Sequence, residues 1–162
     1  MIVKHTVAIV LVALVVCLPD RGVAAAQEPP DPIVEALGAR VRLFLEGVSL
    51  GTTQAAYEEL LAGSPLLKQT EAVEALVKKT EELDDRYGVY RGFEPISARR
   101  VGNDLVLLKH LYKCESFPVV FYFAFYRTPR GDGASDASNN WRVIIVRFDT
   151  KLELLGLDPN VK

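Results

Sequence analysis

The sequence predicts an α+β domain in which three N-terminal helices pack on a curved antiparallel sheet of three to four strands. Helical periodicity is confined to residues 32–87, whereas apolar segments of strand character occupy residues 93–148. The short connections between these strands leave no room for crossover helices, so neighbouring strands should be antiparallel. Because helices and strands are segregated along the chain, the helices are expected to cover one face of the sheet.

The first 26 residues differ in composition from the rest of the chain. Lys4 and His5 precede an apolar run at residues 7–18, and Ala24-Ala25-Ala26 offers a cleavage site of small residues. This order is typical of a secretory signal peptide, so we expect cleavage after Ala26, a secreted or periplasmic location and no membrane segment afterwards. The alternative is an uncleaved membrane anchor, although the run is shorter than the ~20 apolar residues that a spanning helix needs.

The remaining chain is long enough for one domain with a core. A polar, proline-rich leader at residues 27–32 precedes a single α+β domain at residues 33–157. Its first helix begins at Asp31-Pro32, a cap followed by proline in the first turn. Two further amphipathic helices are expected at residues 53–61 and 65–87, where apolar side chains recur every three or four positions.

Four segments after Gly88 show strand character, and the densest signal lies at residues 105–128. Pro95 places the first strand near a sheet edge, because proline cannot donate to a strand ladder. A polar loop at residues 129–140 precedes the last strand, and residues 152–157 are expected to form a short tail element. The predicted strands are residues 93–101, 105–114, 119–128 and 141–148.

Side-chain alternation separates two faces in the central strands. In the strand at residues 105–114, two lysines mark the wetter face, so the opposite face should meet the helices. That concave face would carry Val106, Leu108, His110, Tyr112 and Cys114. In the next strand neither face is polar, which is unusual for an antiparallel sheet with one solvated face. The outer face is therefore expected to be covered by the tail or by a second copy of the chain, and we predict a homodimer through the sheet.

Composition excludes several classes of function. Without Lys4, Arg21 and Asp20 of the predicted signal peptide, the chain has 17 basic and 20 acidic residues, and no basic stripe supports a nucleic-acid partner. His110 is then the only histidine, which excludes a zinc site with several imidazoles in one chain. Cys114 is the only cysteine and cannot form an intramolecular disulfide. No GxGxxG, phosphate-loop, GxSxG or CxxC motif occurs, so no cofactor is expected.

Three stretches of sequence resemble one known fold. They are the helix AAYEELLAGSPL, the hairpin VGNDLVLLKHLYKCE, and the pair PVVFYFAFYRTP and NNWRVIIVRFD. In this order they resemble the nuclear transport factor 2-like superfamily of cone-shaped α+β domains, in particular small secreted bacterial members of unassigned function. The resemblance covers residues 33–157 and implies a pocket between the long helix and the concave sheet, with frequent dimerisation through the sheet. It implies no particular activity, because the fold hosts isomerases, dehydratases, binding modules and assembly domains.

The candidate pocket combines aromatic side chains with the only histidine and cysteine. Its residues are Tyr57, Tyr87, His110, Tyr112, Cys114, Phe123 and Trp141. His110 and Tyr112 on the concave face suggest a base and an oxyanion donor, while the alternative reading, which we favour, is a polar pair satisfied inside a core. For Cys114 we favour a buried small apolar side chain over a reactive thiol. Six arginines suggest either an anion site near one end of the sheet or, as we favour, rim residues that shield sheet edges. They are Arg99, Arg100, Arg127, Arg130, Arg142 and Arg147.

Two hypotheses for the function follow. The first is a non-catalytic extracytoplasmic domain that binds a small apolar ligand or assembles with a partner through the sheet. The second is a small cone-fold enzyme of isomerase or dehydratase type that uses His110 and Tyr112. The steroid-isomerase-like members of the superfamily use an aspartate base, but no carboxylate occurs within the strands at residues 105–114, 119–128 and 141–148. The first hypothesis is therefore favoured, and no catalytic or metal-binding residue is assigned.

Overall fold

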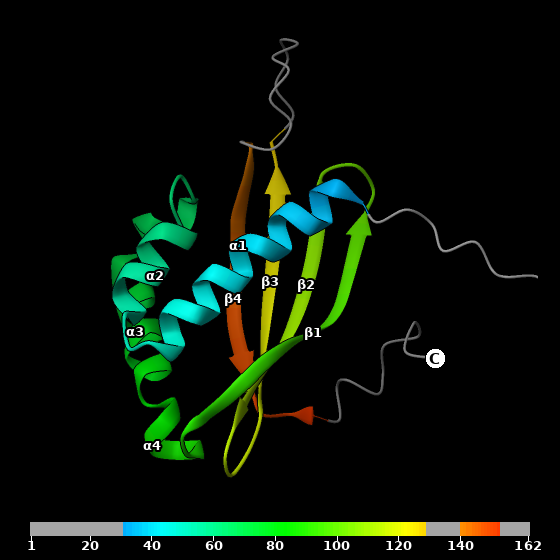
Figure 1. Cartoon of the computed structure of the whole chain (residues 1–162). Coiled ribbons are helices and arrows are strands. Elements are labelled where there is room, and N and C mark those ends of the chain that lie inside the picture. Colours follow the sequence, from blue (N-terminus) through cyan, green and yellow to red (C-terminus); the bar gives the residue numbers. More distant parts are fainter. Residues whose placement is uncertain (1–30, 129–139, 153–162) are drawn as a thin grey trace, which may run out of the picture.

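The computed structural model describes residues 31–128 and 140–152, which form one layer of helices on one face of a four-stranded antiparallel sheet (Figure 1). This architecture confirms the α+β fold class. The predicted signal peptide, the leader up to residue 30, residues 129–139 of the polar loop and the tail beyond Leu152 lie outside the described residues. The predictions made for these segments therefore stay predictions.

The sheet is a meander in which each strand pairs with the next one along the chain. Strand positions agree closely with those predicted, although the first strand starts three residues earlier. As expected from Pro95, the first strand is an edge, and its register shifts between Pro95 and Ser97. The strands are β1 (Tyr90–Val101), β2 (Leu105–Cys114), β3 (Val119–Arg127) and β4 (Trp141–Asp149).

Helix α1 (Pro32–Ser49) crosses the concave face of the sheet diagonally (Figure 1). The side chain of Asp31 accepts a hydrogen bond from the Ile33 amide at 2.9 Å and caps the helix, as the Asp-Pro sequence predicts. The apolar stripe of the helix is almost completely buried, and its Phe44 ring lies 6.0 and 5.7 Å from the Phe121 and Phe123 rings of β3. The members of the stripe are Leu37, Val41, Phe44, Leu45 and Val48.

The region predicted as one long helix, residues 65–87, is divided into three pieces. These are the 3₁₀ turn η1 (Pro65–Lys68), α3 (Thr70–Glu81) and α4 (Leu83–Tyr87). Gln69 separates the first two pieces because its backbone, at φ −101° and ψ 60°, is not helical. Near the second break the Thr80 hydroxyl donates to the Leu76 carbonyl at 2.8 Å, a bond that bends helices.

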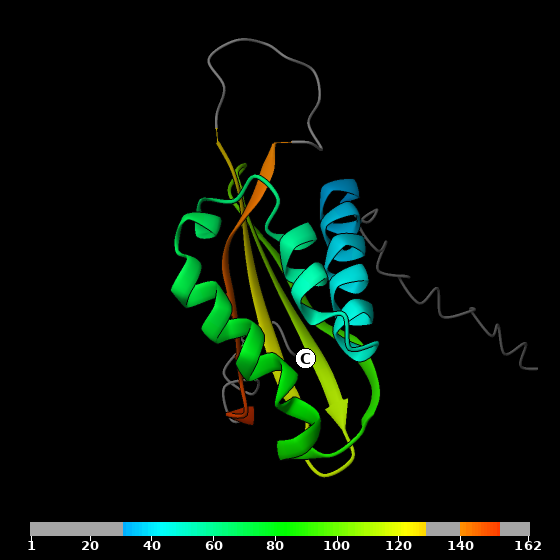
Figure 2. The ribbon, with the colours of Figure 1, turned by 90° about the vertical axis from the view of Figure 1, so that its left-hand side faces the viewer.

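Helix α2 (Thr53–Leu60) and α3 lie on the β4 side of the molecule, and α3 runs beside the β4 edge (Figures 1 and 2). Tyr57 of α2 and Thr80 of α3 share a buried hydrogen bond of 2.9 Å between their hydroxyl oxygens. Gly47 of α1 lets α2 approach closely, since a Cβ atom built there would lie 2.8 Å from the Ala56 Cβ. The close approach at Gly47 thus joins α1 to α2, and the hydrogen bond between the two hydroxyl groups joins α2 to α3.

The side chain of Arg40, a residue of α1, connects this helix to two other elements. Its guanidinium donates to the Trp141 carbonyl at 2.9 Å and to the Leu60 carbonyl at 3.1 Å. The same group lies 5.4 Å from the centroid of the Phe125 ring. One side chain therefore ties α1 to the end of α2 and to the first residue of β4.

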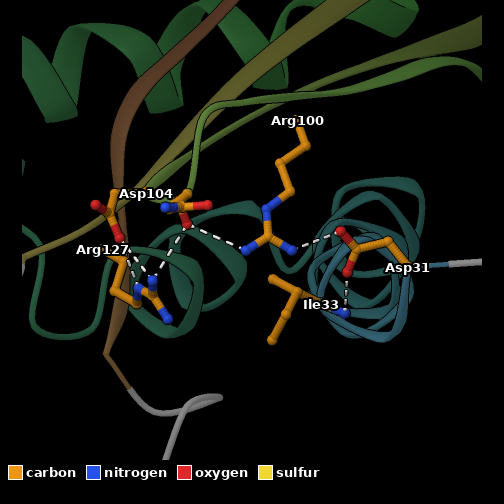
Figure 3. A network of polar contacts seen from close by, with 6 residues as sticks. Asp31, Ile33, Arg100, Asp104 and Arg127 are labelled. Atoms are coloured by element: carbon orange, nitrogen blue, oxygen red, sulfur yellow. Dashed lines mark hydrogen bonds and ion pairs between the residues drawn. The ribbon is translucent and has the colours of Figure 1, made fainter.

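A polar network fixes the start of α1 to the β1–β2 turn (Figure 3). Arg100 forms an ion pair with Asp31 at 2.7 Å, and Arg127 forms one with Asp104 at 2.7 Å. Both arginines also donate to the Asn103 carbonyl, at 3.2 and 3.3 Å. Because their charges are paired within the fold, these two arginines are better explained by structure than by an anion site.

Candidate functional site

The seven residues of the predicted concave pocket come from five different elements. Six of them are buried, and Tyr87, the last residue of α4, is partly exposed and lies 6.2 Å from the Phe117 ring. The β2 alternation is as predicted, since every residue of the concave set is buried and every residue of the opposite set is partly exposed. The structure thus brings His110, Tyr112 and Phe123 together on the face that α1 covers.

His110 is embedded among apolar side chains. It is 5% exposed, and the Phe123 ring meets it edge-on at 6.1 Å between centroids. Its Nδ1 atom is buried and has no hydrogen-bond partner in the part of the chain that the structure describes. Burial, aided by the positive charge of Arg42, lowers the pKa of His110 to about 4, because a charged imidazole is poorly solvated there. The side chain is therefore neutral at pH 7.

Tyr112 is 1% exposed and is surrounded by other rings. The centroids of Tyr90 and Phe121 lie 4.8 and 5.8 Å from its own. Burial raises the pKa of the Tyr112 phenol, and the nearby Asp84 carboxylate raises it further. The phenol consequently stays protonated, and its ring occupies a packed aromatic layer.

The other candidate side chains also behave as core groups. Burial raises the pKa of the Cys114 thiol, which makes the nucleophilic thiolate less available. The Tyr57 hydroxyl is bonded to Thr80, and burial raises the pKa of this phenol as well. Trp141 is 2% exposed, and its Nε1 has no partner among the described residues. Together these groups form an aromatic interior with few available polar atoms.

The described residues contain no cluster of three or more His, Cys, Asp or Glu side chains that could hold a metal ion. Within the same residues, none of the helices combines the length and apolar character needed to cross a membrane.

A hollow of about 480 Å³ lies on the sheet, with a lining that comes mainly from the outer face of β2, β3 and β4. Pairing places Leu107, Ala124 and Ile145 side by side in one row across the three strands. The next row along the strands consists of Lys109, Tyr122 and Arg147. An apolar row thus adjoins a row that carries a phenol between two cations.

The second row has unusual polar geometry. The Arg147 guanidinium lies 4.7 Å from the Tyr122 ring centroid, and the Lys109 ammonium lies 5.9 Å from the same ring. Contacts of this kind between a cation and an aromatic face are attractive. The Tyr122 hydroxyl is buried and has no hydrogen-bond partner in residues 31–128 and 140–152. The Tyr122 hydroxyl is therefore a hydrogen-bond donor without an acceptor among the described residues, and it belongs to a side chain that contacts the Arg147 guanidinium.

Alternation along residues 119–128 separates Tyr122 and Ala124 from Phe123 of the predicted pocket, but no such count in the sequence assigned Arg147 and Ile145 to the outer face. A bulge explains the difference, because Phe125 pairs with Val143 while Ala124 pairs with Ile145. The extra residue, Ile144, reverses the alternation of β4, so Ile145 and Arg147 face outwards although Val143 is buried. The sequence pointed to the outer face only through Lys109 and Lys113, which mark it in β2, and through the apolar character of both faces of residues 119–128.

Comparisons with models of known families, with curated proteins and with solved structures found no match.

Proposed function

We propose that this chain is a non-catalytic extracytoplasmic domain of the nuclear transport factor 2-like type, whose work is to bind a small apolar ligand on the outer face of its sheet. The observation that carries this proposal is the hollow of about 480 Å³ with its apolar row of Leu107, Ala124 and Ile145. Ile145 is 47% exposed, although apolar side chains of this size are usually covered. The predicted signal peptide supports the location outside the cytoplasm.

The state of the concave face supports binding over catalysis. A histidine with a pKa of about 4 is a weak general base at neutral pH. Its Nδ1 receives no orienting hydrogen bond from a described residue, and Tyr112 is 1% exposed. The alternative, an isomerase-like or dehydratase-like enzyme that uses His110 and Tyr112, requires both groups to reach a substrate.

Assembly of two copies through the sheet is the second candidate. Val101, Tyr126 and Ile145 expose 39%, 38% and 47% of their surface, which is typical of a protein interface. Arg142 and Arg147 are exposed on the same face, and two copies packed face to face would bring such like charges together, which disfavours association. The small ligand is therefore the first proposal and the homodimer the second.

Binding can be tested with Nile red, a neutral dye whose fluorescence rises in apolar sites. We expect Ile145→Asp to weaken dye binding about tenfold, because it removes apolar area and adds a charge to the hollow. Leu50→Asp is the matched control, since Leu50 is 78% exposed at the end of α1. Equal effects of the two substitutions would refute binding at the outer face.

Light scattering tests the second candidate independently. A mass of one chain at micromolar concentration would exclude the homodimer. A mass of two chains that falls to one in Ile145→Asp, but not in Leu50→Asp, would support it.

A further inference from the structure

We propose that the outer-face hollow binds an anionic amphiphile, an alkyl chain that ends in a carboxylate, and that Tyr122 and Arg147 hold its head group. This inference rests on the proposed function and adds the chemistry of the ligand. It is carried by the juxtaposition of two cross-strand rows, one apolar and one able to bind an anion.

The apolar row provides the site for the alkyl chain. Leu107 pairs with Ala124, and Ala124 pairs with Ile145, so the three side chains form a strip across β2, β3 and β4. The small side chain of Ala124 leaves space between its larger neighbours Leu107 and Ile145. Ile145, at one end of the strip, exposes 47% of its surface. The volume of about 480 Å³ falls within the range of about 300 to 1,000 Å³ that small-molecule sites occupy.

The adjoining row provides the site for the head group. Tyr122 and Arg147 face each other in the β3–β4 pairing, with the guanidinium 4.7 Å from the ring centroid. The Tyr122 hydroxyl is buried without a partner among the described residues, and buried hydroxyls rarely remain without one. The Arg147 guanidinium is exposed and would pair with a carboxylate oxygen, as charge-assisted bonds favour. When the groups that cover the Tyr122 hydroxyl move aside, this hydroxyl would donate a hydrogen bond to the same carboxylate.

Charge selects an anion over a neutral ligand. Arg147 forms no ion pair with a carboxylate of residues 31–128 or 140–152. The acidic residues of this face in the described chain, Glu94 and Asp149, belong to the next row, beside Leu111 and Val120. Glu94 is also paired with Lys113 at 2.6 Å. Arg147 thus presents a positive charge next to the apolar row, and an anionic amphiphile complements both.

Calorimetric titration of the purified chain with sodium decanoate, below its micelle concentration, tests the proposal. We expect decanoate to bind more tightly than 1-decanol, which has the same chain without the charge. Arg147→Gln should weaken decanoate binding about tenfold through the lost charge-assisted bond and should leave decanol binding unchanged. Tyr122→Phe removes only the hydroxyl and should also weaken decanoate selectively.

Arg86→Gln is the matched control, because Arg86 is an exposed arginine of α4, paired with Glu82 and placed on another element. Equal binding of decanol and decanoate, or equal effects of the two arginine substitutions, would overturn the proposal. The Nile red experiment distinguishes failure of the anionic ligand from failure of the outer-face site. Dye binding that depends on Ile145 without decanoate binding refutes the anionic ligand alone, whereas loss of that dependence refutes the outer-face site itself.

Two other occupants of the hollow are further outcomes of the test. If decanoate binds only after residues 153–162 are deleted, that segment of the chain is the occupant and the proposal fails. If the chain is a dimer that decanoate leaves intact without binding, a second copy occupies the face and the proposal also fails. Decanoate binding by the full chain with the expected effects of Arg147→Gln and Tyr122→Phe supports it.

Discussion

Acidification should destabilise the domain through His110. The pKa of this residue is about 4 in the folded chain and about 6.5 in an unfolded one. Above pH 6.5 the imidazole is neutral in both states and contributes nothing to the pH dependence. Between pH 6.5 and 4 the unfolded state binds a proton that the folded state does not. The free energy of unfolding therefore decreases as the pH is lowered through this range. Below pH 4 both states are protonated and the loss is complete.

The size of the effect follows from the difference between the two pKa values. The full shift corresponds to at most about 3 kcal/mol, of which about 2 kcal/mol should be lost by pH 5. The cause is the removal of the imidazole from water in a site where Nδ1 finds no partner among the described residues. Asp31, whose pKa is lowered below 3.8 by its bonds to Arg100 and Ile33, acts only at lower pH. The window from pH 5 to 7 therefore separates the contribution of His110 from that of Asp31.

Urea denaturation of the wild type and of His110→Leu at pH 5 and pH 7 measures this contribution. The variant has no titrating group at position 110, so its free energy of unfolding should change less between the two pH values. The comparison does not depend on whether the substitution itself stabilises or destabilises the chain, provided that the m-values agree. An identical pH dependence in both proteins, or an NMR titration of His110 near pH 6.5, would show that the imidazole is not desolvated as described.

Two further predictions concern the helical layer. Arg40→Met should lower the free energy of unfolding by about 1 to 3 kcal/mol, because the Trp141 and Leu60 carbonyls lose their donor; a normal urea midpoint would contradict the role of Arg40 as a tie. Gly47→Ala should destabilise by about 1 to 3 kcal/mol, because the new Cβ would lie 2.8 Å from the Ala56 Cβ. Gly38→Ala is its control, since nothing lies within 4 Å of a Cβ in the same helix, and it should stabilise by about 0.5 to 1 kcal/mol; equal midpoints for the two glycine variants would refute the close approach of α1 and α2.

The fold class could be predicted because local signals and the global architecture agree. Asp31-Pro32 has one common meaning, the start of a helix, and the structure uses it in that way. The apolar residues of β2 alternate with lysines, so the buried face of this strand could be read from period-two spacing alone. The prediction of one continuous helix at residues 65–87 was wrong at Gln69, where the backbone is not helical. The break could not be predicted because glutamine is a good helix former and carries no turn signal.

The candidate site was harder to predict, because it depends on register. Tyr122 and Lys109 could be placed on the outer face by counting, but their neighbour in β4 could not. Regular alternation from Trp141 would put residue 147 on the inner face, together with Val143. The bulge at Ile144 turns the strand over and brings Arg147 against the Tyr122 ring. No residue type marks the bulge in the sequence, since Val143, Ile144 and Ile145 are all ordinary strand formers.

The same bulge also explains why the two faces of the sheet differ in what they can do. It lets β4 bury Trp141 and Val143 and still place Val146 and Phe148 against the core. Without the extra residue, Arg147 would face the aromatic interior, where an unpaired charge is strongly disfavoured. One inserted residue therefore keeps the concave side apolar and moves the guanidinium to the outer side. The burial of β4 side chains on the concave side and the exposed charge beside the outer hollow therefore have a common structural cause.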